Sequence, residues 1–116
     1  MFYSNYFSEI TVRELAEQIA NNDGSLQLID VRELQEVSFA SIPGFTILPL
    51  SQFSEWSKSI NNRFDPQTTT IVLCHHGVRS AQMCQWLISQ GFTQVSNVSG
   101  GIDAYSRIID DSILRY

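Results

Sequence analysis

The chain has 116 residues, the usual length of one domain, and a formal net charge of −5, which argues against non-specific binding to nucleic acid. Hydrophobic residues make up 43% of the chain, so one sizeable core can form, but the longest apolar runs are too short to cross a membrane. Residues 1–6 lack the basic region and apolar block of a signal peptide. We therefore expect one domain over residues 1–116, located in the reducing cytoplasm, with neither nucleic-acid nor membrane partners.

The N-terminal quarter of the chain predicts an arm, a helix and a strand. Residues 1–8 show no clear hydrophobic period and are expected to pack as an arm on the body. Residues 11–20 predict a helix, because Thr11 and Glu14 have the spacing of a capping box and apolar residues recur at helical intervals. After a polar turn that ends the helix, residues 26–31 predict a short strand.

The middle of the chain continues the alternation of helices and strands. A helix is expected over residues 33–39 and a strand over residues 46–49, with a Pro-Gly turn between them. Ser51 is expected to cap a further helix. The apolar face of that helix, which we expect in the core, consists of Phe53, Trp56 and Ile60.

The last third of the chain predicts two strands and two helices. Residues 69–73 form a β-branched run typical of a buried strand, and Ser80 is in or beside the capping position of the helix that follows. The buried side of this helix is expected to consist of Met83, Trp86, Leu87 and Ile88. Residues 95–98 predict a strand, the last helix is expected over residues 102–109, and residues 110–116 are a short tail.

This alternation of strands and helices predicts an α/β fold. The spacings between strands are too long for hairpins, so we expect a mainly parallel sheet with helices on both faces. In such sheets the functional site lies beyond the carboxyl ends of the strands. Asp30, Cys74 and residues 99–101 all fall at such ends, so we expect them to lie near one another.

The segment after the 69–73 strand has the composition of a nucleophile site. Cys74 stands at the end of the strand, Gly77 lets the backbone turn tightly, and Arg79 closes the loop. Such a loop can turn successive backbone N–H groups inward as an anion nest, to which the helix N-terminus and the arginine add positive potential. A thiol that faces the nest is stabilised as the nucleophilic thiolate. We therefore interpret Cys74 as a nucleophile rather than a buried structural thiol.

The cysteine count limits the other uses of sulfur in this chain. The chain has two cysteines, Cys74 and Cys84, which suggests neither a disulfide scaffold nor a common zinc pattern. His75 and His76 adjoin Cys74 but need further converging ligands, so no metal is expected. Cys84 is interpreted as a small buried hydrophobe within a helix, and a role as the resolving cysteine for Cys74 stays open.

Three motifs resemble those of the rhodanese-like sulfurtransferases. Residues 74–80, CHHGVRS, resemble the Cys-x4-Arg active-site loop of that family, residues 30–33 match its DVRE motif, and residues 100–105 match its closing Gly-Gly pattern. The resemblance extends over about residues 9–107. It implies a three-layer rhodanese-like α/β sandwich and thiosulfate sulfurtransferase activity through a persulfide on Cys74.

The resemblance also implies roles for the loop residues. Cys74 would attack the outer sulfur of thiosulfate or of a persulfide donor and pass that sulfur to cyanide or a thiol. Backbone N–H groups of the loop, including those of Gly77 and Val78, would hold the anionic persulfide. Arg79 would orient the loop and add positive charge.

The roles of two adjacent histidines stay open in the sequence. His75 and His76 could bind substrate, either by attracting an anionic donor or by contacting an acceptor. They could equally be exposed loop residues without a catalytic role.

Two pairs of residues are expected to support the site structurally. Asp30 and Arg32 could line the pocket, but we favour a scaffold ion pair, because a charged pair beside a turn most often orients the backbone. Gly100 and Gly101 are expected to let their loop approach the Cys74 loop closely.

Other functions compete with a turnover enzyme. The chain could be a persulfide carrier or a protein-docking rhodanese module whose acidic body binds a basic partner. A phosphatase is less favoured, because tyrosine-type phosphatases carry a loop one residue longer and no general acid is evident. The expected partners are a small sulfur donor and a thiol acceptor, which could be carried by a protein, and nothing in the sequence calls for a metal or organic cofactor.

Overall fold

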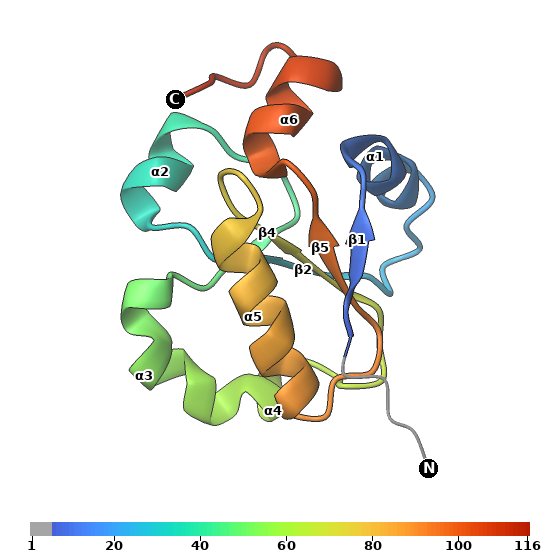
Figure 1. The fold of residues 1–116 in the computed structure, drawn as a ribbon, viewed down its shortest axis with the longest axis vertical. Helices are drawn as coiled ribbons and strands as arrows, with labels where there is room; N and C mark the ends of the chain where they lie inside the picture. Colours follow the sequence, from blue (N-terminus) through green and yellow to red (C-terminus); the bar gives the residue numbers. More distant parts are fainter. Residues whose placement is uncertain (1–5) are drawn as a thin grey trace.

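The computed structural model describes residues 6–116 and is built around one sheet (Figure 1). Its five strands are all parallel and lie in the order β1-β5-β4-β2-β3. In chain order they are β1 Ser8–Ile10, β2 Gln27–Asp30, β3 Thr46–Ile47, β4 Thr70–Leu73 and β5 Val95–Val98. The predicted α/β fold with a mainly parallel sheet is therefore confirmed.

Helices cover both faces of this sheet. They are α1 Val12–Ala20, α2 Leu34–Phe39, α3 Phe53–Trp56, α4 Ile60–Arg63, α5 Val78–Ser89 and α6 Gly101–Ile108, with 3-10 turns η1 Leu50–Gln52 and η2 Ser57–Ser59. In Figure 1, α5 crosses in front of the sheet with α3 and α4 beside it. The helices α1 and α6 pack together, and their apolar residues share a core cluster with the opposite face of the sheet.

The central strand β4 shows how the sequence divides the core. Its four residues are all buried, as the β-branched run in the sequence predicts. Because side chains alternate along a strand, Ile71 and Leu73 pack in the cluster with α1 and α6, whereas Val72 and Cys74 pack in the cluster with α5. The thiol of Cys74 therefore lies on the α5 side of the sheet.

The start of the described chain departs from the prediction in one element. The capping box of Thr11 and Glu14 is confirmed, with reciprocal hydrogen bonds of 3.0 and 3.1 Å. Residues 1–8 were expected to form an arm. Residues 1–5 lie outside the described residues, while Ser8–Ile10 forms the edge strand β1 and pairs with β5. Three residues with two exposed side chains are too few to show a hydrophobic period.

The predicted helix after Ser51 is wrong in its start and its continuity. The cap before α3 is Gln52, and both the backbone N–H and the hydroxyl of Ser51 donate to the Glu33 carboxylate instead. The segment consists of four short turns rather than one helix. Trp56 is buried as expected, but Phe53 is 36% exposed and packs edge-on against Trp56.

The tail after α6 returns across the molecule. In Figure 1 the chain leaves α6 and runs toward α2, where the C-terminal end is marked. Residues 110–116 have no helix or strand, as expected for a tail. The side chain of Tyr116 nevertheless contacts residues of the Cys74 loop and of α2, which places it at the candidate site.

Candidate active site

The Cys74 loop forms the candidate site, at the carboxyl end of the central strand. The strand β4 ends at Leu73, and α5 begins at Val78 with Gly77 as its N-cap residue. Gly77 has φ 101°, a left-handed conformation that side-chain-bearing residues rarely adopt, so glycine suits this turn. The prediction that Ser80 is in or beside the capping position is wrong, because the N-cap residue is Gly77, three residues earlier, and Ser80 lies in the first turn of the helix.

The thiol of Cys74 faces two hydrogen-bond donors. Cys74 is 1% exposed, and the backbone N–H of Gly77 donates to its Sγ at 3.0 Å. The Ser80 hydroxyl oxygen lies 3.2 Å from the same sulfur and is fully buried. Donors directed at a buried sulfur stabilise negative charge on it, so this arrangement suits a thiolate or a persulfide.

The N-terminus of α5 adds positive potential next to this sulfur. This helix has 12 residues, its N-cap residue makes no side-chain hydrogen bond, and its first turn has no acidic residue. The first N–H groups of a helix have no partners within the helix, and the helix dipole is positive there. An anion bound at the Cys74 sulfur would therefore find backbone donors at this end of α5.

Two glycines bring α6 against the Cys74 loop. Gly100 and Gly101 have φ 79° and 59°, and an added Cβ on Gly101 would lie 2.5 Å from the Cys74 carbonyl oxygen and 2.3 Å from that of His75. The backbone N–H groups of Ile102 and Asp103 donate to the same two carbonyl oxygens at 3.0 and 3.1 Å. The start of α6 thus fixes the backbone of the loop from outside.

The guanidinium of Arg79 is directed at α2. Its two terminal nitrogens donate to the Glu36 carboxylate at 2.7 Å each, and the Arg79 side chain is 35% exposed. These hydrogen bonds lower the pKa of Glu36 to about 2 and raise the pKa of Arg79. Glu36 therefore balances the positive charge that Arg79 was expected to give the loop.

Asp30 and Arg32 form a buried ion pair behind the loop. The side chains are 1% and 0% exposed, and the closest pair of charged atoms is 2.7 Å apart. Arg32 also donates to the backbone carbonyl of Ala40 at 2.8 Å, and its own N–H donates to Asp30. These contacts join the end of β2 to the end of α2, which favours the interpretation of the pair as a scaffold.

Tyr116 links this ion pair to the loop. Its hydroxyl accepts from Arg32 at 3.0 Å and donates to Glu36 at 3.0 Å. Its ring stacks on His75 with 3.9 Å between centroids, and the His76 ring lies 3.9 Å from His75. Burial and the nearby His76 ring lower the pKa of His75, so the neutral form dominates near neutral pH. A neutral, stacked His75 favours a structural role over attraction of anions.

Cys84 lies within α5 and is inaccessible. The residue is 0% exposed, and burial raises the pKa of its thiol far above the ordinary range, with smaller contributions from Glu9 and Cys74. Both cysteines are free thiols. A protonated, buried thiol is a poor resolving nucleophile, so the structure favours the interpretation of Cys84 as a core residue.

Several contact residues of the site were missed in the sequence. Glu36 and Tyr116 come from α2 and from the tail, and no local pattern marks either one. Asn97 is 2% exposed on β5, where it contacts Ser80, Glu9 and the Gly77 carbonyl. The only signal for Asn97 was a polar residue in a buried strand just before the Gly-Gly turn.

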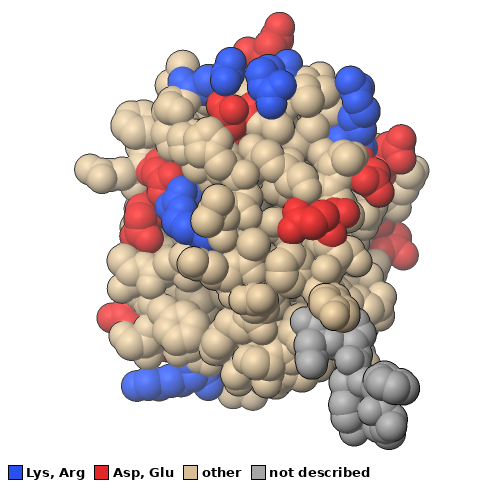
Figure 2. Space-filling model, in the orientation of Figure 1, with Lys and Arg blue, Asp and Glu red and all other residues tan. Residues whose placement is uncertain are grey.

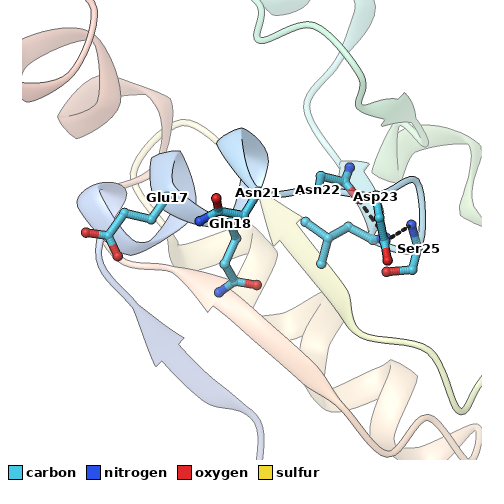
Figure 3. A pocket seen from close by; sticks show the side chains of 7 residues that line it. Glu17, Gln18, Asn21, Asn22, Asp23 and Ser25 are labelled. Atoms are coloured by element: carbon cyan, nitrogen blue, oxygen red, sulfur yellow. Dashed lines mark hydrogen bonds between the residues drawn. The ribbon is translucent and has the colours of Figure 1, made fainter.

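Other surface features carry little of this chemistry. The hollow in Figure 3 lies at the end of α1 and is lined mostly by polar side chains such as Glu17 and Gln18, with no cysteine or histidine among its lining residues. Two of its lining residues, Asn22 and Asp23, accept the backbone N–H groups of Gly24 and Ser25. Residues 6–116 contain no group of three or more His, Cys, Asp or Glu side chains that could hold a metal ion.

None of the described helices is long and apolar enough to span a membrane.

The visible face of the molecule carries charges of both signs. In Figure 2, basic and acidic side chains are interspersed, and this face shows no broad basic patch. A local positive potential at the Cys74 loop therefore depends on backbone N–H groups and α5 rather than on surface cations.

Comparison with known proteins identifies curated relatives. Rhodanese-like/PpiC domain-containing protein 12, chloroplastic, of Arabidopsis thaliana is 51% identical over 90 residues, which are 78% of this chain and 30% of that protein. The putative sulfur carrier protein YrkF of Bacillus subtilis is 33% identical over 77% of this chain and 46% of that protein. The thiosulfate sulfurtransferase GlpE of Glaesserella parasuis is 31% identical over 87% of this chain and 88% of that protein. The chain thus spans less than half the length of the first two relatives.

Solved structures and a family profile give the same result. The crystal structure of a rhodanese-like domain protein from Staphylococcus aureus superposes with a TM-score of 0.75 and 25% identity, covering 95% of this chain and 99% of that one. The profile of the rhodanese-like domain matches residues 11–108, which include the Cys74 loop, the Asp30–Arg32 pair and the start of α6. This chain therefore belongs to the rhodanese-like domain family.

Proposed function

We propose that the chain is a sulfurtransferase that carries a sulfane sulfur on Cys74. The observation that carries the proposal is the position of the Cys74 sulfur, which accepts the Gly77 N–H at the uncapped N-terminus of α5. Membership of a family with relatives named as sulfurtransferases supports the same reaction class. The proposed catalytic residues are Cys74 and Arg79, and Arg79 acts by orienting the loop.

The proposed reaction has two half-reactions. The Cys74 thiolate attacks the outer sulfur of the donor, a new S–S bond forms, and the donor's S–S bond breaks with its electron pair leaving as sulfite or a thiolate. Backbone N–H groups of Gly77, Val78 and Arg79 hold the anionic outer sulfur. An acceptor thiolate or cyanide then takes this sulfur, and the electron pair of the broken bond returns to Cys74.

The donor is the least defined part of this proposal. Thiosulfate is a dianion, whereas the Arg79 charge is balanced by Glu36 and His75 is neutral near neutral pH. A persulfide carried by a thiol has less charge and suits such a loop better. His76, Gly77 and Val78 are proposed to contact the donor or the acceptor, since His76 and Val78 are exposed at the mouth of the loop.

A carrier that exchanges sulfur with protein partners is the second candidate. The similarity to a protein named as a putative sulfur carrier and the balanced charge of Arg79 both favour it. A phosphatase is disfavoured, because the Arg79 guanidinium is directed at Glu36 and the loop has the shorter Cys-x4-Arg spacing.

We also propose that residues 1–116 form one rhodanese-like domain that works in a reducing compartment such as the cytoplasm. The profile match over residues 11–108 and the single sheet support one domain. The two free cysteines support a reducing compartment.

Steady-state kinetics with thiosulfate and cyanide separate the candidates. We expect parallel double-reciprocal plots, because the sulfur leaves its donor before the acceptor binds, and complete loss of turnover in Cys74→Ser. Formation of the persulfide without turnover would favour the carrier. Hydrolysis of an aryl phosphate that disappears in Cys74→Ser would overturn the sulfurtransferase proposal.

A further inference from the structure

The side-chain amide of Asn97 is held in one orientation beside the site. Its Nδ2 lies 3.0 Å from the Gly77 carbonyl oxygen and 3.0 and 3.1 Å from the two carboxylate oxygens of Glu9. All of these partners are acceptors, so they engage both amide hydrogens. A flipped amide would place Oδ1 against the same oxygens, and therefore Oδ1 must face Ser80. Ser99 donates to the Glu9 carboxylate at 2.7 Å and fixes it in turn.

The Ser80 hydroxyl stands between two acceptors. Its oxygen lies 2.5 Å from Asn97 Oδ1 and 3.2 Å from Cys74 Sγ, and all three side chains are at most 2% exposed. A serine hydroxyl has one hydrogen, so it can donate to Asn97 or to Cys74 but not to both at once. A protonated Cys74 can donate its own S–H to the Ser80 oxygen while Ser80 donates to Asn97.

We propose that Asn97, held by Glu9, is a positioning residue that sets the direction of the Ser80 hydroxyl hydrogen and so controls the charge on Cys74. With Cys74 protonated, the hydrogen points to Asn97. When Cys74 has lost its proton to the solvent and the electron pair stays on Sγ, the hydrogen turns to the sulfur. Asn97 Oδ1 then loses the hydrogen bond from Ser80 while it stays buried. The cost of this unsatisfied acceptor opposes formation of the thiolate.

This inference rests on the proposed function, since it deepens the role of the Cys74 thiol. The charged and titratable groups around that thiol are His75 and His76 on its own loop and Arg79 and Cys84 on α5, with Glu9 on β1 and Glu36 on α2 behind them. Asn97 itself has no charge. Its effect on the sulfur must therefore pass through the groups that it holds, which are the Ser80 hydroxyl and the Gly77 carbonyl, and removal of the Ser80 hydroxyl separates these two routes.

A double-mutant cycle tests the inference. The rate of Cys74 alkylation by iodoacetamide is measured across pH, with peptide mapping to exclude Cys84, for the wild type, Asn97→Leu, Ser80→Ala and the double variant. Below the midpoint of the profile, we expect Asn97→Leu to react about fivefold faster, because Ser80 then donates only to sulfur. Ser80→Ala should react about fivefold slower, because the thiolate loses a donor.

The double variant distinguishes positioning from a merely structural role. Without the Ser80 hydroxyl, Asn97→Leu should have no effect on the profile, so the double variant should match Ser80→Ala. An equal effect of Asn97→Leu in both backgrounds, or a slower reaction of Asn97→Leu alone, would overturn the inference.

A second substitution covers the case in which Asn97→Leu fails to fold. Glu9 is exposed, and Glu9→Gln replaces a carboxylate that can only accept by an amide that can also donate, so that of the present acceptors only the Gly77 carbonyl still opposes a flip of the Asn97 amide. It should speed alkylation in the wild-type background more than in Ser80→Ala, and equal effects would contradict the inference. Alkylation needs no sulfur donor, so failure of this test is distinct from failure of the sulfur-transfer reaction.

Discussion

Gly101 is the glycine whose added Cβ would meet the backbone of the Cys74 loop. Gly101→Ala should lower the free energy of unfolding by about 2–4 kcal/mol, because its Cβ would overlap backbone atoms of His75 and Cys74 at a positive φ. Chemical denaturation measures this loss, and sulfur transfer should fall with it because the loop must shift.

Gly91 provides the matched control for that substitution. It also has a positive φ, of 97°, but an added Cβ there meets nothing within 4 Å. Gly91→Ala should lower the free energy of unfolding by only about 1 kcal/mol, because it adds backbone strain without a steric clash. Equal losses for the two variants would show that the contact with the Cys74 loop is unimportant.

At this scale the sequence predicted the residues whose role depends on neighbours along the chain. The position of Cys74 at a strand end and the turn at Gly77 follow from local patterns. The assignment of Ser80 in or beside the capping position was wrong, because Gly77, three residues earlier, ends the turn in a left-handed conformation. Asn97 and Glu9 could not be assigned, because Asn97 contacts Ser80 across 17 residues of sequence and Glu9 contacts Asn97 across 88.

The helices α2 and α5 are joined by the ion pair between Glu36 and Arg79. The pKa of Glu36 is about 2 in the folded chain, against an ordinary value of 4.5, so the pair stabilises the fold fully above about pH 4.5 and loses this contribution as the pH falls toward about 2. Glu36→Gln should therefore be less stable than the wild type by about 1 kcal/mol at neutral pH, since Arg79 is partly exposed. The difference should vanish toward pH 2.

Denaturation curves across this pH range measure the effect. Arg79→Met removes the same pair from the other helix, so the wild type minus Arg79→Met should show the same acid dependence. A difference that stays constant with pH for both variants would mean that the pair does not couple α2 to α5.

Elements were predictable where their pattern was long and failed where it was short. The central strands β4 and β5 and the helix α1 have clear periods or caps. The strand β1 has three residues, and the segment from Leu50 to Arg63 mixes α and 3-10 turns, so neither shows a complete period. Tertiary contacts decide both: pairing with β5 forms β1, and burial of Trp56 and Ile60 holds the broken turns.

Over the whole molecule, Arg32 joins β2 and α2 to the C-terminal tail, 84 residues further along the chain. It contacts Asp30, the carbonyl oxygens of Glu36 and Ala40, and the Tyr116 hydroxyl. Arg32→Met should lower the free energy of unfolding by about 3–5 kcal/mol, because the Asp30 carboxylate would be left buried without its cation. Thermal or chemical unfolding followed by circular dichroism measures this loss.

The ion pair of Arg115 with Asp103 is the control for Arg32. It has the same residue types, but the Arg115 side chain is 57% exposed. Arg115→Met should change stability by less than about 1 kcal/mol. Similar losses for both arginines would contradict the view that burial makes the Arg32 pair essential to the fold.

Mass spectrometry of the intact chain after incubation with thiosulfate, for the wild type and Cys74→Ser, tests the central claim most directly. The account predicts a gain of one sulfur atom in the wild type alone, reversed by cyanide or a thiol. An organic persulfide should give the same adduct, and faster if the balanced charge of Arg79 disfavours the dianion. An adduct that persists in Cys74→Ser, or no adduct on the wild type with either donor, would contradict a persulfide on Cys74.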